Sequence, residues 1–268
     1  MKQSLGISII GILCSGTFLA AQNPDVVTKP LYEVRLTGQN TLGKSYGRAL
    51  EKRSGLREII VGGKTMLRSY RFESVLPGKN IPSSEKASTA FQNDGKNVQI
   101  EKTLVDINTG KDFAKIETKM EFGDSRINVS HTMIPLVDFT LKPHGQPEDM
   151  LVFPIETVQN ATVEVWDANG RKLTGLIPSL SQKENWSLDG IYRKVLLRTD
   201  EGTLTFTAGE KTIIHFVYLH NLARNTLWRN PVLRIKRQIG IYTEKELLNQ
   251  KKGEPFFWGY SIEVEKNK

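Results

Sequence analysis

Apolar and polar residues alternate with a period of two along much of the chain. In residues 113–122 the even positions are apolar apart from Thr118, while lysine and glutamate alternate at positions 115–121. Successive side chains of a β-strand point to opposite faces, so this pattern predicts a strand with one buried face and one face in water. The lysines compensate Glu117 and Glu121, which favours a solvated face over a pair of catalytic carboxylates.

Similar patterns predict further strands, and turn sequences such as Asn108-Thr-Gly-Lys and Gly123-Asp-Ser separate several of them. The segments are residues 32–37, 70–76, 98–108, 126–133, 162–166, 192–198, 203–207, 213–219, 232–241 and 256–264. Short strands with turns between them are typical of an all-β fold, and we expect an antiparallel β-sandwich, immunoglobulin-like in architecture.

Helical signals occur in two short segments. Thr243 and Glu246 form a capping box that predicts a helix ending near Gly253, and residues 46–53 are a second candidate, stopped by Gly55. The predicted fold therefore has one or two short helices.

The alternation breaks at residues 142–148, Lys-Pro-His-Gly-Gln-Pro-Glu, where two prolines and a glycine interrupt it. This break divides the chain into residues 22–142 and 149–268, each near the size of an immunoglobulin-like domain. Two small sandwiches and one large joint sandwich both agree with this division.

The N-terminus has the form of a secretory signal peptide, residues 1–21. Lys2 is followed by an uncharged stretch to residue 24, with an apolar run at residues 5–13 and small residues Ala20 and Ala21. Interspersed serines and glycines make the stretch too polar for a membrane span. Leu13, directly before Cys14, argues against lipidation. We expect a secreted, periplasmic or surface protein of bacterial origin, with no membrane span in the mature chain.

Cleavage after Ala21 would remove Cys14, which is the only cysteine. Disulfides, thiol nucleophiles and cysteine-ligated zinc are then excluded. The 25% of charged residues agrees with a globular chain rather than a disordered one. The formal net charge of +8 favours acidic glycans or an envelope protein as partners over nucleic acid for an exported protein. The alternative interpretation is that the charge serves solubility alone.

Residues 38–45, Gly-Gln-Asn-Thr-Leu-Gly-Lys-Ser, satisfy the phosphate-loop pattern of nucleotide hydrolases, in which Gly43, Lys44 and Ser45 would contact phosphates and magnesium. The preceding segment alternates apolar and polar residues, whereas a phosphate-loop strand is buried on both faces. The overlapping Gly-Lys-Ser-Tyr-Gly, residues 43–47, matches a nucleophile elbow but lacks a strand leading directly into it. We interpret both matches as coincidental and expect no cofactor.

The histidines do not form a metal-binding pattern. His215 and His220 are five residues apart on a predicted strand, so their side chains point to opposite faces. His131 shares a face with apolar residues, which indicates a core histidine or the wall of a pocket. His144 lies in residues 142–148, where the alternation of apolar and polar residues breaks. We expect no metal site.

Aromatic residues fall into two groups. The alternating run at residues 256–264 places its aromatics on one face, which predicts core. Trp166, Trp186 and Trp228 lie near turns or polar residues and are candidates for stacking on a ligand.

A basic stretch without acidic residues lies between Glu210 and Glu244. Arginine matches carboxylates, sulfates and phosphates with two hydrogen bonds, so this stretch predicts a polyanion-binding surface. An edge strand protected by its charges is the alternative interpretation. The predicted ligand-binding residues are Arg224, Trp228, Arg229, Arg234 and Lys236.

No convincing catalytic group of residues emerges, so by elimination we expect a binding or assembly module rather than an enzyme. Its partner would be an acidic glycan or a surface protein, as in a pilus or adhesion component. The alternative is a carbohydrate-active enzyme on a large sandwich, with dispersed carboxylates and His131 or His215 in a cleft. A nucleotide hydrolase is a remote third hypothesis. The sequence does not indicate an oligomeric state.

Overall fold

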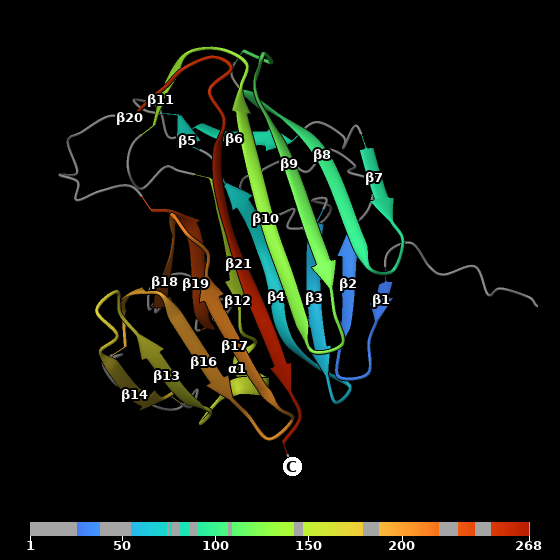
Figure 1. The fold of residues 1–268 in the computed structure, drawn as a ribbon. Coiled ribbons are helices and arrows are strands. Elements are labelled where there is room, and N and C mark those ends of the chain that lie inside the picture. Colours follow the sequence, from blue (N-terminus) through green and yellow to red (C-terminus); the bar gives the residue numbers. More distant parts are fainter. Residues whose placement is uncertain are drawn as a thin grey trace, which may run out of the picture.

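The computed structural model describes residues 26–37, 55–73, 75–76, 81–85, 90–106, 109–141, 147–178, 188–219, 230–238 and 248–267, apart from the side chains of residues 70–91 and 218–230. Within these ranges the chain is almost entirely antiparallel β-structure, which confirms the predicted fold class. Its single described helix is α1, Ile155–Val158. Figure 1 shows the strands stacked in two layers.

The back layer in Figure 1 is an eight-stranded sheet, counted over the described residues. In spatial order it consists of β1 (Val26–Thr28), β2 (Glu33–Thr37), β3 (Gly55–Val61), β4 (Lys64–Glu73), β12 (Glu148–Val152), β19 (Asn230–Arg237), β18 (Thr212–Leu219) and β15 (Gly190–Tyr192).

The front layer is an eleven-stranded sheet, again counted over the described ranges. In order it contains β14 (Lys172–Leu176), β13 (Thr162–Trp166), β16 (Lys194–Arg198), β17 (Thr203–Ala208), β21 (Phe256–Glu265), β10 (Arg126–Pro135), β9 (Asp112–Phe122), β8 (Asn97–Asp106), β6 (Ile81–Glu85) and β5 (Val75–Leu76), with β7 (Ala90–Asn93) also paired to β8. A small separate sheet pairs β11 (Phe139–Leu141) with β20 (Leu248–Gln250).

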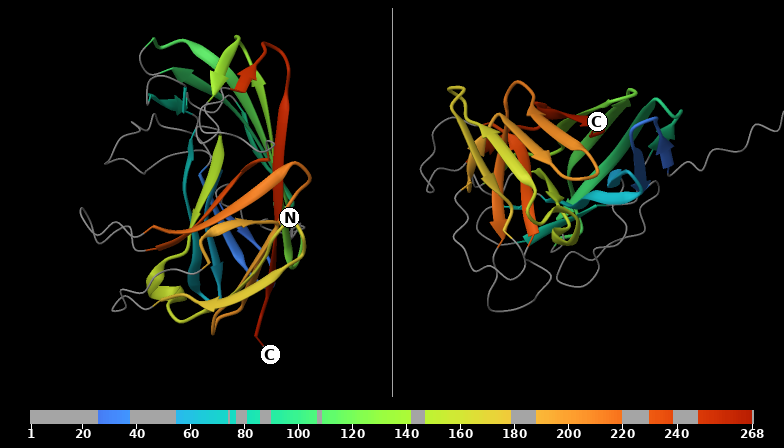
Figure 2. Two further views of the ribbon diagram at one scale, coloured as in Figure 1. Left: turned by 90° about the vertical axis from the view of Figure 1, so that its left-hand side faces the viewer. Right: turned by 90° about the horizontal axis from the view of Figure 1, so that it is seen from below.

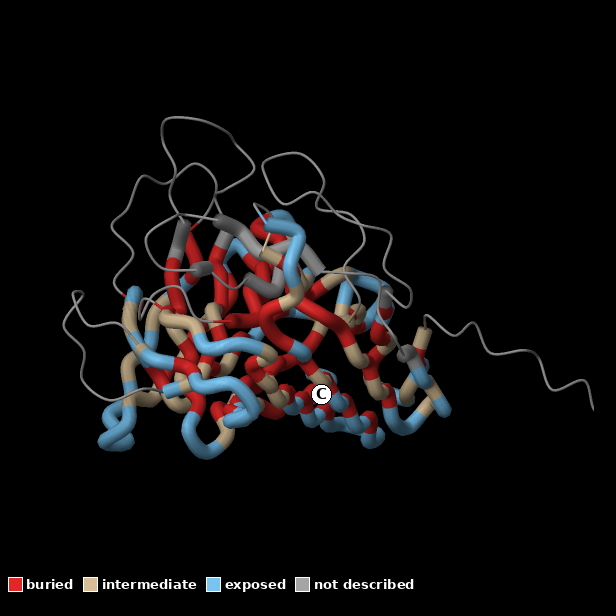
Figure 3. The backbone as a smooth tube through the Cα atoms, turned by 90° about the horizontal axis from the view of Figure 1, so that it is seen from above, coloured by how far each residue is buried: buried red, intermediate tan, exposed pale blue. Residues whose placement is uncertain are grey.

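Both sheets contain strands from both sides of the interruption at residues 142–148. β12 lies between β4 and β19, and β21 lies between β17 and β10. The largest cluster of buried apolar residues extends from Val27 to Val264 and fills the space between the layers. Figure 3 shows this buried interior, with exposed residues at turns and along the outer surface. The division into residues 22–142 and 149–268 stays a prediction.

The alternation of the sequence corresponds to burial in the longest strands. In β9 the even positions, from Ala114 to Phe122, are buried. In β21 the stripe of residues 256, 258, 260, 262 and 264 is buried, whereas Phe257 is exposed. The prediction that this aromatic run is core is therefore confirmed.

The continuous strand predicted over residues 192–198 is broken in the structure. Its first part, β15, belongs to the eight-stranded sheet and its second part, β16, to the eleven-stranded sheet. Arg193, at the crossing point, donates hydrogen bonds to the carbonyl groups of Thr212, Ala208 and Gly209. Alternation alone does not show when a chain changes sheets, because side chains still alternate on both sides of the crossing.

The predicted helix at residues 243–253 is wrong at its C-terminal end. Leu248–Gln250 forms β20, which pairs with β11, and Lys252 donates its backbone N–H to Asp138. Thr243 and Glu246 lie outside the described residues, as does the second predicted helix at residues 46–53. Pairing with a distant strand has overridden the local helical preference.

The predicted signal peptide, residues 1–21, also lies outside the described residues. No helix in the described part of the chain has the length and apolar character needed to cross a membrane.

Gly259 of β21 is required by the close approach of three backbone segments. A Cβ atom at this position would lie 2.7 Å from the carbonyl oxygen of Val129. One at Gly209 would lie 2.7 Å from the carbonyl oxygen of Gly259. Glycine at positions 209 and 259 therefore permits these backbone segments to approach closely.

We expect Gly259→Ala to lower the free energy of unfolding by about 1–3 kcal/mol, as other overpacking substitutions do. Urea denaturation measures the change. Phe257→Ala is the control on the same strand, because its side chain is exposed, and it should shift stability by at most about 0.5 kcal/mol. Equal stability of Gly259→Ala and the wild type would contradict this close packing.

Candidate active site

Two adjacent carboxylates of β12 point to opposite faces of the eight-stranded sheet. Asp149 reaches the interior and contacts His131 of the other sheet. Glu148 is on the outer face, where it pairs with cations of β19. Both are buried, with exposures of 1% for Glu148 and 8% for Asp149. The alternation of one short strand thus creates two separate polar clusters.

Glu148 is held by Arg234 through one of its two oxygen atoms. Arg234 Nε and Nη2 lie 2.8 and 2.6 Å from Glu148 Oε1. The other oxygen, Oε2, is buried and accepts no hydrogen bond from the described residues. Lys236 Nζ is 4.0 Å from Oε2, which is beyond hydrogen-bonding distance. The arrangement leaves a fixed carboxylate with one oxygen available to a donor.

The register of the strands explains this geometry. Glu148 of β12 is directly opposite Lys236 of β19, and Met150 is opposite Arg234. Arg234 therefore reaches diagonally to Glu148, as long side chains on one face of a sheet can. On the other side of β12, the backbone of Glu148 pairs with that of Glu73 in β4.

Lys236 is a buried lysine whose charge is disfavoured. Burial lowers the pKa of its ammonium group, and the neighbouring Arg234 charge lowers it further, while Glu148 opposes the shift. A lysine of this kind gives up its proton more readily than an exposed one.

His215 of β18 extends the outer-face cluster, which we define as Glu148, Arg234, Lys236, His215 and Asp189. Its Nε2 lies 3.3 Å from Asp189 Oδ1, and its backbone pairs with Arg234. Burial lowers the pKa of His215; Arg234 and Lys236 also lower it, whereas Asp189 raises it. These shifts favour the neutral ring, which donates a hydrogen bond at one nitrogen and accepts one at the other.

The inner cluster forms around Asp149, between the sheets. His131 Nε2 is 2.7 Å from Asp149 Oδ2, and Thr118 Oγ1 is 2.9 Å from His131 Nδ1. The His131 ring stacks on Trp258 with centroids 4.7 Å apart. All four side chains are largely buried, so the prediction that His131 is a core histidine or lines a pocket is confirmed as core.

The pKa of Asp149 reflects its neighbours. Burial raises the pKa, but the charge of His131, hydrogen bonds from His131 and Tyr260, and the charge of Lys102 together hold it below its usual value. Burial and the adjacent Asp149 raise the pKa of Tyr260 well above its ordinary value. The inner cluster is a network of buried side chains that contact one another between the two sheets.

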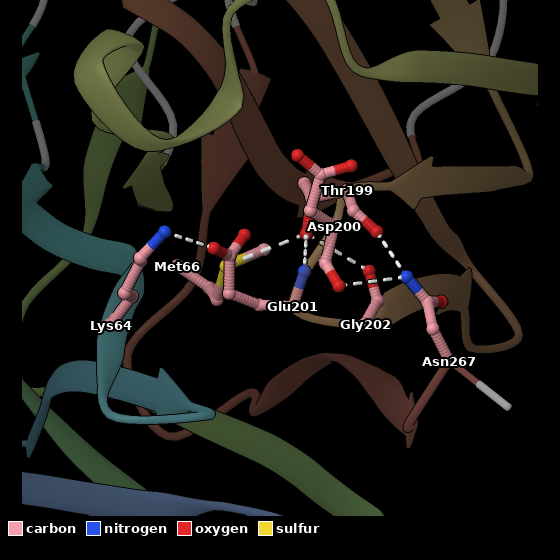
Figure 4. Close-up of polar contacts among 7 residues, drawn as sticks. All are labelled: Lys64, Met66, Thr199, Asp200, Glu201, Gly202 and Asn267. Atoms are coloured by element: carbon pink, nitrogen blue, oxygen red, sulfur yellow. Dashed lines mark hydrogen bonds and ion pairs between the residues drawn. The ribbon is translucent and has the colours of Figure 1, made fainter.

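A third polar region is a groove of about 770 Å³ at the other end of β12. It is lined by the α1–β13 turn, the β16–β17 turn and the C-terminal residues Lys266 and Asn267. Asn267 donates to the carbonyl groups of Thr199 and Asp200, and Lys64 pairs with Glu201 nearby (Figure 4). The charged side chains that line this groove are exposed, so water screens them and the groove suits binding better than proton transfer.

The structure places two of the five predicted ligand-binding residues. Arg234 and Lys236 share a face, as expected, and both interact with Glu148. Arg224, Trp228 and Arg229 lie outside the described residues, so the predicted surface as a whole stays a prediction.

Sequence reasoning missed Glu148 and Asp189. Glu148 stands at the end of the interruption at residues 142–148, and its partner Arg234 is 86 positions away. No local pattern reports such a contact. The available signal was that two acidic residues, Glu148 and Asp149, stand directly before the apolar segment 150–153.

Other candidates are placed differently. Trp166 is covered by two cations, with Lys194 Nζ and Lys172 Nζ at 4.9 and 5.4 Å from the ring centroid. Trp186, His144 and His220 lie outside the described residues, as do Gly43, Lys44 and Ser45. The strand before that segment, β2, is antiparallel to both neighbours, unlike the parallel sheet of a phosphate-loop protein. In the described ranges no three potential metal ligands come together.

No protein-family model and no curated protein matches the sequence. Solved structures do share the fold. The aldose epimerase homologue from C. elegans has a TM-score of 0.57 at 9% identity, covering 91% of this chain and 98% of that one. Galactose 1-epimerase from Lactobacillus acidophilus NCFM has a TM-score of 0.55 at 8% identity, covering 91% and 94%. A galactose mutarotase-like protein from Lactobacillus casei ATCC 334 has a TM-score of 0.53 at 9% identity, covering 89% and 99%.

The architecture is therefore the β-sandwich of aldose epimerase-like proteins, and the immunoglobulin-like form of the prediction is not confirmed. The leading functional interpretation, a binding or assembly module for an acidic glycan or surface partner, is wrong. Structures that share the fold along nearly their whole length are named as epimerases or mutarotase-like proteins. The error has a physical origin: Arg234 and Lys236 were interpreted as surface cations, because their buried carboxylate partner is distant in sequence.

Proposed function

We propose that the protein is a carbohydrate-active enzyme that interconverts the anomers of an aldose at the outer-face cluster. The fold shared with sugar epimerases supports this proposal. The observation that carries it is the pair formed by Glu148 Oε2 and Lys236 Nζ, a buried acceptor and a buried donor 4.0 Å apart. The proposal corresponds to the alternative function considered from the sequence, a carbohydrate-active enzyme on a large sandwich. The pair now assigns specific residues to it.

Anomer interconversion needs a base and an acid at one carbon atom. The anomeric hydroxyl and the ring oxygen are both bonded to C1, so two catalytic groups close together can reach both. Glu148 Oε2 accepts the proton of the anomeric hydroxyl, and Lys236 donates a proton to the ring oxygen. The C1–ring oxygen bond breaks and C1 becomes an aldehyde. Rotation about the C1–C2 bond and the reverse transfers then close the ring as the other anomer.

The remaining residues orient these groups and the sugar. Arg234 fixes the Glu148 carboxylate by donating from both Nε and Nη2 to Oε1. His215 lies on the same face two strands from Glu148, which is about 10 Å across the sheet. With Asp189 it offers hydrogen-bonding groups for the hydroxyls at the far side of a sugar ring. Figure 2 shows the layers that carry these strands from the side and from below.

Polarimetry tests the proposed function. Freshly dissolved α-D-galactose or α-D-glucose changes its optical rotation slowly in buffer, and we expect the chain to accelerate this change in proportion to its concentration. Heat-denatured protein is the control. The proposal is contradicted if the optical rotation changes no faster with the protein than in buffer alone, for both hexoses and for a pentose such as L-arabinose.

A further inference from the structure

We propose that Lys236 also forms an imine with the open-chain form of an aldose, so that the site can hold its sugar covalently. This inference rests on the proposed function, because the aldehyde arises when the sugar ring opens beside Lys236. The geometry that points to it is a buried amine next to both a cation and a carboxylate with an available oxygen.

Lys236 differs from the other described lysines of the surface. Its side chain is 10% exposed, whereas those of Lys172 and Lys251 are 46% and 61% exposed. Lys172 has a close ion pair, 2.9 Å from Glu164. The 4.0 Å separation of Lys236 from Glu148 is not a hydrogen bond, and Glu148 is instead held by Arg234. The ammonium group is thus buried beside a carboxylate without being fixed by it.

The surroundings of Lys236 make its ammonium group release a proton more readily, which leaves the nucleophilic neutral amine. The titratable and charged groups of the described residues that face Lys236 are Glu148 of β12, Arg234 of β19 and His215 of β18. Burial and Arg234 lower the pKa of Lys236 more than Glu148 raises it. Lysines activated in this way, by desolvation and a neighbouring cation, serve as Schiff-base nucleophiles.

Ring opening generates both reactants at once. When Lys236 donates its proton to the ring oxygen, it becomes a neutral amine beside the new C1 aldehyde. Its nitrogen attacks C1, the C–N bond forms, and the carbonyl oxygen takes up a proton. The nitrogen then loses one proton, the hydroxyl leaves with a further proton as water, and a C=N bond forms. Loss of the second proton from the nitrogen gives the neutral imine, so two protons are taken up and two are released. The sum is amine plus aldehyde giving imine plus water, without any oxidant or reductant.

Reductive trapping tests the inference. Glycolaldehyde, which cannot form a sugar ring, and D-galactose are each incubated with the protein and sodium cyanoborohydride, and the modified lysine is located by peptide mass spectrometry. We expect modification of Lys236 before any exposed lysine with both probes. Its rate should reach half-maximum below the ordinary pKa of a lysine amine, because burial lowers the pKa of Lys236.

Two variants serve as controls. Lys236→Arg keeps the positive charge beside Glu148 but cannot form an imine, so trapping at this position should be lost. Lys172→Arg removes an exposed lysine and should leave trapping at Lys236 unchanged. Circular dichroism shows whether each variant has the wild-type fold.

The outcomes separate this inference from the proposed function. If the protein accelerates mutarotation but glycolaldehyde modifies only exposed lysines, the inference is overturned and the proposed function stands. Trapping of Lys236 by glycolaldehyde without mutarotation of any sugar would support the amine chemistry and contradict the epimerase proposal. Uniform modification of all lysines by both probes would overturn the inference.

Discussion

Glu148→Gln is expected to lower the mutarotation rate by about 10²–10⁴-fold, the usual contribution of a general acid or base. Glutamine retains an oxygen for the Arg234 hydrogen bonds, so Arg234 keeps a partner. Its amide cannot accept and return a proton as the carboxylate does. The loss should therefore appear in kcat more than in KM, because the sugar hydroxyl contacts are largely preserved.

The chain provides a matched control for this substitution. Glu164 pairs with Lys172 at 2.9 Å on the eleven-stranded sheet, so Glu164→Gln removes the same charge from another glutamate–lysine pair. We expect Glu164→Gln to retain full activity. Urea denaturation establishes that both variants are folded at the assay temperature. Wild-type kcat in a folded Glu148→Gln variant would exclude Glu148 as the base.

Asp149→Asn is expected to lower the free energy of unfolding at neutral pH by about 3–5 kcal/mol, the range found when one partner of a buried ion pair is removed. Asp149 is 2.7 Å from His131 and lies near the buried Lys102. The asparagine amide does not compensate these charges inside a low-dielectric core. Urea denaturation at pH 7 measures the difference.

The difference in unfolding free energy between wild type and Asp149→Asn should become smaller as the pH falls. The pKa of Asp149 in the folded protein is below its value of 3.8 in the unfolded chain. The ionised carboxylate therefore stabilises the fold above about pH 4, and this contribution is lost as pH falls through the folded-state pKa. We expect the difference in unfolding free energy between wild type and Asp149→Asn to narrow as the pH falls below about 4.

Asp138→Asn is the control for this prediction. Asp138 also has a lowered pKa, from the Lys252 backbone N–H and the Lys251 side chain, but it is exposed. Solvent screening should make its effect on stability small. A similar stability loss in both variants, or a gap that does not change with pH, would contradict the proposed role of the inner cluster.

The sequence by itself determined the fold class, because alternation is a local property of each strand. Residues 113–122 and 256–264 could be assigned to half-buried strands, since burial of one face requires apolar residues at every second position. The same pattern placed His131 either in the core or at the wall of a pocket, and the structure places it in the core. Even the shared face of Arg234 and Lys236 was evident from their spacing of two.

Only the tertiary structure decided which strands are neighbours, and the candidate site depends on that. Glu148 meets Arg234 and Lys236 because β12 pairs with β19, and Asp149 meets His131 because the two sheets stack. The change of sheet at Arg193 and the strand at residues 248–250 also arise from contacts between distant segments. Alternation specifies which face a side chain occupies, but the free energy of packing whole sheets together selects the partner it meets there.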